Sequence, residues 1–280
     1  MKLNIKNELK GRELPLVMGI LNVTPDSFSD GGDYSDLKSA VMRADELICE
    51  GAEIIDVGAE STRPGAEPVS PEIQIERFYE VIKAVKAKHS TRISIDTQSS
   101  TAAEAALEAG ADIINDISSG SDPKMFKLAA EKSAGIVLMH MQGTPRTMQK
   151  TPEYENVTFD VMEYLKKRKS SAVEAGVCED NIILDPGIGF GKTLKHNLEL
   201  TRNLRKIKDL GSPVLYGASR KSFIGKITGR QEAKNREGGT IASTIYAMQQ
   251  GVSLIRVHRP GINLDAMRLY RTLEEGINPA

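Results

Sequence analysis

Three acidic or amide side chains follow short apolar runs that lie far apart in the sequence. Asp96 comes near the end of RISIDT, Asn115 lies in DIINDI, and Asp185 lies in NIILDPG. A carboxylate accepts two parallel hydrogen bonds, so it suits a planar heterocycle that carries an N–H group beside an exocyclic amine. These residues therefore predict a site for a planar, amine-bearing ligand, provided that the three runs end side by side.

Cationic side chains form a second group of candidate ligands. Arg63, Lys221, Arg256 and His258 offer charged donors, and the last three follow apolar runs late in the chain. Arginine and lysine both bind phosphate oxygens, arginine through two parallel N–H groups. The two groups together predict a heterocycle joined to a phosphorylated group. A Schiff-base role for Lys221 is disfavoured, because no acid adjoins it.

Eight apolar runs must position these residues, and a helical pattern follows each of them. The runs are rich in Ile, Val and Leu without strict alternation, which is typical of parallel strands buried on both faces. They cover residues 16–23, 53–58, 92–97, 112–117, 135–140, 181–187, 213–219 and 253–258. Eight strand–helix units in 280 residues favour an α/β fold, a single-domain (β/α)8 TIM barrel, over an open doubly wound sheet.

The barrel is predicted to occupy residues 16–280, and residues 1–15 are predicted to form an N-terminal extension over its base. In a parallel barrel the carboxyl ends of the strands converge on one face, so the polar residues that end the runs predict an active site there. Segments 22–36 and 58–72 are longer than usual strand-to-helix connections. We expect both to be irregular binding loops.

Composition excludes several functional classes. The chain has 37 basic and 38 acidic residues, and its net charge of −1 argues against nucleic acid or a membrane as the main partner. Two distant cysteines exclude a zinc ribbon and a disulfide scaffold. The amino terminus has no apolar export segment, and no run is long enough to span a membrane, so we expect a cytoplasmic protein.

Three familiar motifs are approached but not met. DPGIGFGKT (185–193) ends like a phosphate-binding P-loop, yet Pro186 stands where the first glycine belongs, and Lys192 occupies the last glycine position of GxGxxG. GASRK (217–221) begins like a nucleophile elbow but has Lys221 in place of the final glycine. The four histidines show no metal spacing. Hydrolase and zinc chemistry are therefore disfavoured.

Eight motifs in order closely resemble the bacterial dihydropteroate synthases, a family of pterin-binding enzymes, from Val17 to the final helix. They are MGILNVTPDSFSDGG, DVGAESTRPGA, ISIDT, INDIS, LMHMQGTPRTMQ, DPGIGFGKT, SRKSFIG and RVH. The resemblance implies a transferase of folate biosynthesis that is a sulfonamide target. Such an enzyme condenses 6-hydroxymethyl-7,8-dihydropterin pyrophosphate with 4-aminobenzoate and releases 7,8-dihydropteroate and pyrophosphate.

The resemblance also implies residue roles. Pterin would be bound by Asp96, Asn115, Met139, Asp185 and Lys221. Pyrophosphate would be bound by Asn22, Arg256 and His258, with Asn22 as ligand of a Mg²⁺ cofactor. The 4-aminobenzoate pocket would consist of Phe28, Thr62, Arg63, Pro64, Phe190 and Ser222. The catalytic groups would be Asp96, Lys221, Arg256 and His258.

An arylamine is neutral at pH 7 and needs no strong base, so we expect an SN1-like substitution driven by stabilisation of the departing pyrophosphate. Two alternatives stay open: a methyltransferase that takes a methyl group from methyltetrahydrofolate, and an inert pterin-binding module. The family also implies a homodimer, through late helices that include the apolar segment 240–250. Two departures from the family pattern, Ala59 and Arg259–Pro260, bear on loop conformation.

Overall fold

The computed structural model describes residues 3–24, 32–61 and 65–276, apart from the side chains of residues 32–36. In this part of the chain, eight parallel strands form one sheet in the order β6-β5-β4-β3-β2-β1-β8-β7. The strands are β1 (Leu16–Asn22), β2 (Ile54–Gly58), β3 (Arg92–Asp96), β4 (Ile113–Asp116), β5 (Gly135–Met139), β6 (Ile182–Asp185), β7 (Leu215–Tyr216) and β8 (Leu254–Val257).

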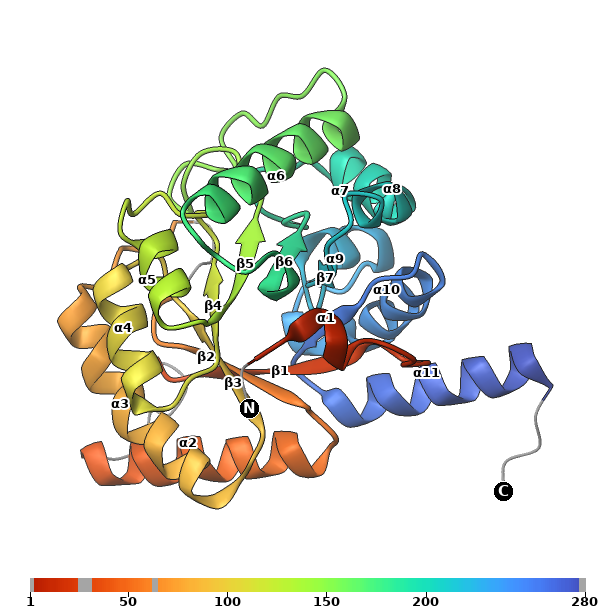
Figure 1. Ribbon diagram of the computed structural model, residues 1–280. Coiled ribbons are helices and arrows are strands. Elements are labelled where there is room, and N and C mark those ends of the chain that lie inside the picture. The colour runs from red at the N-terminus through yellow and green to blue at the C-terminus, as the bar shows by residue number, and fades with distance from the viewer. Residues whose placement is uncertain (1–2, 25–31, 62–64, 277–280) are drawn as a thin grey trace.

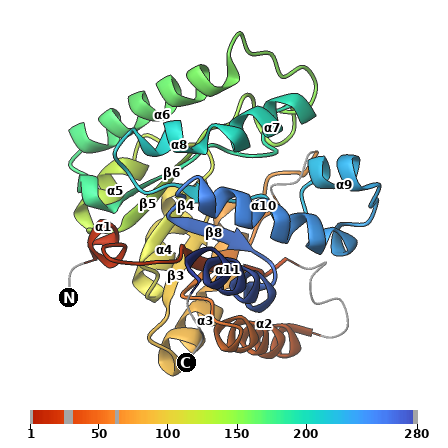
Figure 2. The same ribbon diagram turned by 90° about the vertical axis from the view of Figure 1, so that its right-hand side faces the viewer.

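The two strands at the ends of this order also meet. Leu184 of β6 forms a parallel bridge with Val214, directly before β7, and its N–H donates to the carbonyl of Pro213 at 2.8 Å. The sheet therefore closes into a barrel, with helices outside the strands in both views (Figures 1 and 2). The predicted (β/α)8 class is confirmed, and the open doubly wound alternative is wrong.

The helices follow the strands in alternation and begin at good capping residues. Ser70, Ser99 and Asn156 each accept a hydrogen bond from the third residue of the helix that follows them. The α-helices are α1 (Ile5–Glu8), α2 (Gly32–Cys49), α3 (Pro71–Lys88), α4 (Ser100–Ala109), α5 (Met125–Glu131), α6 (Val157–Glu174), α7 (Leu194–Arg202), α8 (Leu204–Lys208), α9 (Ser222–Thr228), α10 (Glu237–Gln249) and α11 (Pro260–Glu275). Short 3₁₀ turns are η2 (Glu179–Asn181) and η3 (Ala233–Arg236). Among the described residues, no helix is long and apolar enough to cross a membrane.

Helix α2 begins earlier than the sequence predicted. The segment 22–36 was expected to be a loop throughout, but the backbone is helical from Gly32 onward. The reason is local. Glycine is tolerated at a helix N-terminus, and acidic residues are favourable in the first turn because the N-terminal end of a helix carries a partial positive charge. The carboxyl-terminal part of the predicted loop is therefore helical. The second predicted loop ends at Ser70, the N-cap of α3.

Alternation along the strands sorts the barrel interior into layers. Outward residues join the large core beneath the helices, whereas Met18, Ile54, Ile113, Ile183 and Leu254 belong to a separate buried cluster inside the barrel. Because side chains repeat on one face every second residue, the residue two positions after each of these also faces inward. Those positions lie closer to the carboxyl ends of the strands. An apolar layer thus forms the floor of whatever site lies above it.

The amino-terminal segment closes the opposite end of the barrel. Ile5 of α1 is fully buried against the interior cluster, and its N–H donates to Oδ1 of Asn181 at 3.2 Å. The amide group of Asn181 in turn donates to the carbonyl of Leu3 at 3.1 Å. Solvent therefore has its access to the interior from the carboxyl ends of the strands, where the predicted site residues lie.

Candidate active site

Strand periodicity brings the predicted residues together above the apolar floor. Asp56, Asn115 and Asp185 lie two positions after Ile54, Ile113 and Ile183, and Arg256 lies two after Leu254. The barrel interior at this level is consequently polar and charged. Each of the three acidic or amide residues is less than a tenth exposed.

Arg256 is the centre of this polar layer. Its Nε donates to Oδ2 of Asp56 at 2.6 Å, and its Nη2 donates to Oδ2 of Asp96 at 3.0 Å. Asn115 donates to the same oxygen of Asp56 from Nδ2 at 3.1 Å. Oδ1 of Asp56 is buried and has no hydrogen-bond partner among the described residues. One guanidinium thus links carboxylates from β2 and β3, and Oδ1 of Asp56 remains as an open acceptor. The polar layer of Asp56, Asp96, Asn115, Asp185, Lys221 and Arg256 is called the cup below.

Burial and neighbouring charges compete in setting the protonation of this layer. Burial raises the pKa of Asp96, the Arg256 cation opposes that shift, and nearby Asp56 reinforces it. Burial lowers the pKa of Arg256, but the two carboxylates outweigh it and raise the pKa overall. The arginine therefore stays charged. The pKa of Asp96 is raised, so binding of a ligand can change the protonation of this carboxyl group.

Asp185 and Lys221 form the other half of the cup. Oδ1 of Asp185 accepts a hydrogen bond from the N–H of Gly187 at 2.7 Å, and Nζ of Lys221 donates to the carbonyl of Ile188. Burial lowers the pKa of Lys221 to about 8, with Asp185 opposing the shift. Burial raises the pKa of Asp185, and Lys221 opposes that shift in turn.

The loop after β6 makes room for the lysine side chain. Nζ of Lys221 lies 4.4 Å from the centre of the Phe190 ring, a cation–π contact. Gly189 has a φ of +84°, and a Cβ there would lie 2.8 Å from Cδ of Lys221. Glycine is therefore required at this position both by the backbone conformation and by the close approach of Lys221.

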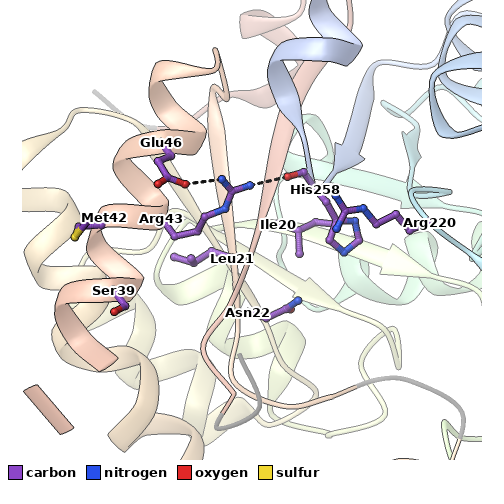
Figure 3. A pocket seen from close by; sticks show the side chains of 9 residues that line it. All are labelled: Ile20, Leu21, Asn22, Ser39, Met42, Arg43, Glu46, Arg220 and His258. Atoms are coloured by element: carbon purple, nitrogen blue, oxygen red, sulfur yellow. Dashed lines mark hydrogen bonds and ion pairs between the residues drawn. The ribbon is translucent and has the colours of Figure 1, made fainter. Parts of the chain in front are cut away.

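A cavity of about 380 Å³ adjoins the cup between the end of β1, α2 and the residue after β8. Asn22 and His258 line it, together with Arg43 and Glu46 of α2 and Arg220 (Figure 3). Arg43 lies between Glu46, at 2.7 Å, and the backbone carbonyl of His258, at 2.8 Å. This cavity therefore combines the amide of Asn22 and the ring of His258 with two arginines that are each paired with a glutamate, Arg43 with Glu46 and Arg220 with Glu237.

Hydrogen bonds fix the position of His258 in this cavity. Its Nδ1 lies 2.9 Å from Oγ of Ser219, and its backbone N–H donates to the same oxygen at 3.3 Å. Pro260 starts helix α11 immediately afterwards, at a position where proline is favourable. The unusual Arg259–Pro260 pair is therefore the start of a helix, and His258 keeps its place. The other departure, Ala59, is buried, and its carbonyl accepts a hydrogen bond from Arg77 at 2.8 Å.

Comparison with known proteins decides the family. Residues 18–258 match the family of pterin binding enzymes. A dihydropteroate synthase of Streptococcus pyogenes is 50% identical over 259 residues, which cover 92% of this chain and 95% of the relative. The chain belongs to the pterin-binding enzyme family.

Solved structures of these pterin-binding enzymes have the same fold. Dihydropteroate synthase from Xanthomonas albilineans with 4-aminobenzoic acid superposes with a TM-score of 0.89 at 38% identity, covering 94% of each chain. The same organism's enzyme in complex with 7,8-dihydropteroate has a TM-score of 0.85 at 36% identity, again over 94% of each chain. The resemblance read from the motifs is confirmed.

The structure brings most of the residues predicted from the family together. Asp96, Asn115, Asp185 and Lys221 surround the cup, and Met139 is buried at the end of β5, where its carbonyl accepts a hydrogen bond from Ser119 at 2.8 Å. Asn22 and His258 line the adjacent cavity. Phe190 and Ser222 lie at the cup's rim, on the β6–α7 loop and at the start of α9. Four predicted residues lie outside the described part of the chain: Phe28, Thr62, Arg63 and Pro64.

Sequence reasoning gave no role to two residues of this site. Asp56 anchors both Arg256 and Asn115. Its one signal was an acidic residue within an apolar run, and on the adjacent strand it pairs with Ser94, two residues before Asp96. Arg43 had no such signal, because it is one of many charged residues on an amphipathic helix.

The Asp56–Arg256 contact generates a stability prediction. Asp56→Ala should lower the free energy of unfolding by about 3–5 kcal/mol, because it leaves a buried guanidinium short of a partner. The double variant with Arg256→Met should lose less than the sum of the two single changes, with a coupling energy of about 1–3 kcal/mol. Urea unfolding of the four proteins measures this coupling.

The exposed pair Arg12–Glu53, with both side chains about a third exposed, serves as the control. Its removal should cost no more than about 1 kcal/mol. Additive effects of the two substitutions at Asp56 and Arg256 would contradict the proposed dependence of one on the other.

Proposed function

We propose that this chain condenses 6-hydroxymethyl-7,8-dihydropterin pyrophosphate with 4-aminobenzoate, forming 7,8-dihydropteroate and pyrophosphate in folate biosynthesis. The observation that carries the proposal is the charged layer inside the barrel, in which Arg256 joins Asp56 and Asp96 beside Asn115. Two comparisons support the proposal. The chain belongs to the pterin-binding enzyme family, and dihydropteroate synthases match it over nearly its whole length. A methyltransferase has no use for the cationic cavity beside the cup.

The cup binds and orients the pterin through a set of complementary acceptors and donors. Asp185 and Asn115 present oxygens to the donor edge of the heterocycle, and the ammonium group of Lys221 meets its acceptor atoms. Met139 packs against the ring. These contacts take place over the apolar floor, which excludes water from the lower face of the site.

The substitution starts with breakage of the bond between the pterin methylene carbon and the pyrophosphate oxygen. The bonding electrons leave with the pyrophosphate, where the guanidinium of Arg256 and the ring of His258 stabilise them. The methylene carbon becomes positively charged, and the Asp96 carboxylate stabilises that cation. The amine nitrogen of 4-aminobenzoate then forms the new bond and afterwards releases its proton to solvent or to pyrophosphate. An SN1-like course follows, because no strong base faces the amine.

Mg²⁺ is the cofactor we propose for the pyrophosphate. In the described part of the chain, no group of three or more His, Cys, Asp or Glu side chains is arranged to hold a metal. Asn22 offers one hard oxygen at the cavity, which fits a cation that keeps several waters and takes its other ligands from phosphates. When bound there, Mg²⁺ supplies charge neutralisation of the leaving group.

The 4-aminobenzoate pocket adjoins the pterin cup at its rim. Phe190 provides an apolar face, and its ring is already held by Lys221. Ser222 begins helix α9, where its hydroxyl and the helix N-terminus suit a carboxylate. We place Thr62, Arg63, Pro64 and Phe28 in the same pocket on the strength of the family motifs alone.

The experiment that tests this function is incubation of the chain with both substrates and Mg²⁺. Pyrophosphate and 7,8-dihydropteroate should appear in equal amounts. Asp185→Ala should lower pterin affinity about tenfold to a hundredfold, because a charged hydrogen bond to the ligand is lost. Asp209→Ala, at an exposed aspartate after α8, is the matched control and should behave as wild type.

Unfolding midpoints of the two variants should be measured first, so that loss of the fold is recognised. A folded wild-type chain that releases no pyrophosphate from the two substrates would overturn the proposed function. Unchanged pterin affinity in folded Asp185→Ala would overturn the position given to the ligand.

Metal removal provides a separate prediction. Chelation of Mg²⁺ should weaken binding of the pyrophosphorylated pterin far more than binding of the pterin alcohol, because only the former carries the charge that needs neutralising. Asn22→Ala should reduce this difference. Calorimetry with the two ligands, with and without chelator, measures both effects, and equal weakening of the two ligands would contradict the metal's role.

We propose a cytoplasmic homodimer as the working form of the enzyme. An apolar groove of about 310 Å³ lies between α7, α9 and α10, and Phe223, Ile224, Ile227 and Tyr246 are among its lining residues. Ile227 is 56% exposed, which is unusual for an isoleucine in a groove with such apolar walls. A second copy of the chain, docked through the same face, would cover it.

Light scattering tests the dimer. Ile227→Lys should convert a dimeric wild type into a monomer, because the charge would be desolvated at the interface. Leu273→Lys, at a still more exposed apolar residue of α11 outside the groove, should stay dimeric. A monomeric wild type at micromolar concentration would contradict the proposed assembly.

A further inference from the structure

Lys192 is a buried lysine that contacts no carboxylate among the described residues. It lies at the end of the β6–α7 loop, in the glycine-rich segment that fits neither phosphate-binding motif, and it is only 3% exposed. Its Nζ lies 2.9 Å from the carbonyl oxygen of Phe190, 3.1 Å from that of His140 and 3.0 Å from Nδ1 of His140. An ammonium group has three N–H donors, and here three acceptors surround it.

The protonation of His140 fits this arrangement. Burial, with a further contribution from the charge of Lys192, lowers the pKa of His140 to about 3. The ring is therefore neutral at physiological pH, and its Nδ1 is able to accept a hydrogen bond. Burial lowers the pKa of Lys192 as well, and the nearby charge of Asp185 opposes that shift.

Lys192 joins two loops whose backbones are in direct contact. Gly191 has a φ of +59°, and a Cβ there would lie 2.5 Å from the carbonyl oxygen of Gln142. The hydroxyl of Tyr154 donates to the carbonyl of Gly191 at 2.7 Å. Backbone this closely packed leaves little room for water, so the buried carbonyls of His140 and Phe190 need a protein donor.

The residues at the two ends of this link belong to different halves of the proposed site. His140 directly follows Met139, and its N–H donates to the carbonyl of Asp185 at 3.0 Å. Both neighbours are assigned to the pterin. Phe190 lies under Lys221 and is assigned to the 4-aminobenzoate pocket. One ammonium group thus connects the backbone of the pterin cup to that of the second pocket.

We propose that Lys192 is a positioning residue that holds the pterin and 4-aminobenzoate halves of the site in register. It touches no reacting atom, and it acts through the carbonyls of His140 and Phe190. The inference rests on the proposed function, because the two halves are defined by the two substrates. It gives a role to a lysine that the proposed substitution does not otherwise use.

The test is Lys192→Met in the full chain, a substitution of similar length that removes the three donors. Lys195→Met, at an exposed lysine of α7, is the matched control. With Lys192→Met, the KM values for both substrates should rise about tenfold or more, as expected for loss of charged hydrogen bonds, while kcat falls much less. Amide hydrogen exchange of residues 187–191 should also become faster without any substrate present.

A merely structural role would reduce the amount of folded enzyme, and so lower kcat while both KM values stayed unchanged. That result, or amide exchange at 187–191 as slow as in wild type, would overturn the proposal. If Lys192→Met fails to fold, Lys192→Gln, which keeps two donors, is judged by the same measurements. Absence of turnover in the wild type would count against the proposed function, whereas the exchange measurement would still decide the role of Lys192.

Discussion

The contact on which the site depends is the guanidinium of Arg256 between the carboxylates of Asp56 and Asp96. Asp56 is completely buried, and leaving it unpaired there would cost several kcal/mol. The arginine comes from β8 and reaches past β1 to acids on β2 and β3, so the contact exists only when these strands are adjacent in a closed barrel. Pairing of Arg256 with the two carboxylates therefore depends on the strand order, and that strand order in turn buries charges that need this pairing.

Barrel closure has a second consequence, which is the layering of the interior. A parallel barrel places alternate residues inside, and on four strands the lower inward positions are Ile54, Ile113, Ile183 and Leu254. The next inward positions toward the carboxyl ends carry charge or amide groups. The change from apolar to polar occurs within two residues on several strands at once. Rigid strands, rather than loops, thus hold the pterin side of the site, which limits the entropy lost when the ligand binds.

Much of this arrangement could be read from the sequence, because it depends on local patterns. Apolar runs of Ile, Val and Leu predicted the strands, and the polar residues that end them made Asp96, Asn115, Asp185 and Arg256 candidate ligands. The family motifs supplied roles that the pattern alone could not. Closure by a single bridge between Leu184 and Val214 had no signal in the sequence, because it pairs two short segments through long-range geometry.

The residues that were given no role have a common physical reason. Asp56 and Lys192 were both visible, but their importance comes from which atoms face them in the folded chain. Lys192 was met only as a residue that spoils a glycine motif, and its partners are backbone carbonyls, which every sequence possesses. Sequence reasoning finds side chains that face a ligand more readily than side chains that support backbone beneath it.

The balance of charge explains how one site accommodates two very different parts of a substrate. Inside the barrel, the carboxylates of Asp56, Asp96 and Asp185 lie near the cations Arg256 and Lys221. In the proposed function, a neutral heterocycle enters such a layer without adding a net charge to a region of low dielectric constant, and it exchanges hydrogen bonds with groups that are already compensated. The pyrophosphate would be costly at that depth. We propose that it extends instead toward the cavity beside the cup, where solvent screens its charge and where Asn22 and His258 line the wall. In that arrangement the reacting carbon would lie at the boundary between the two regions, so departure of the pyrophosphate would move negative charge outward while the cation stays beside Asp96.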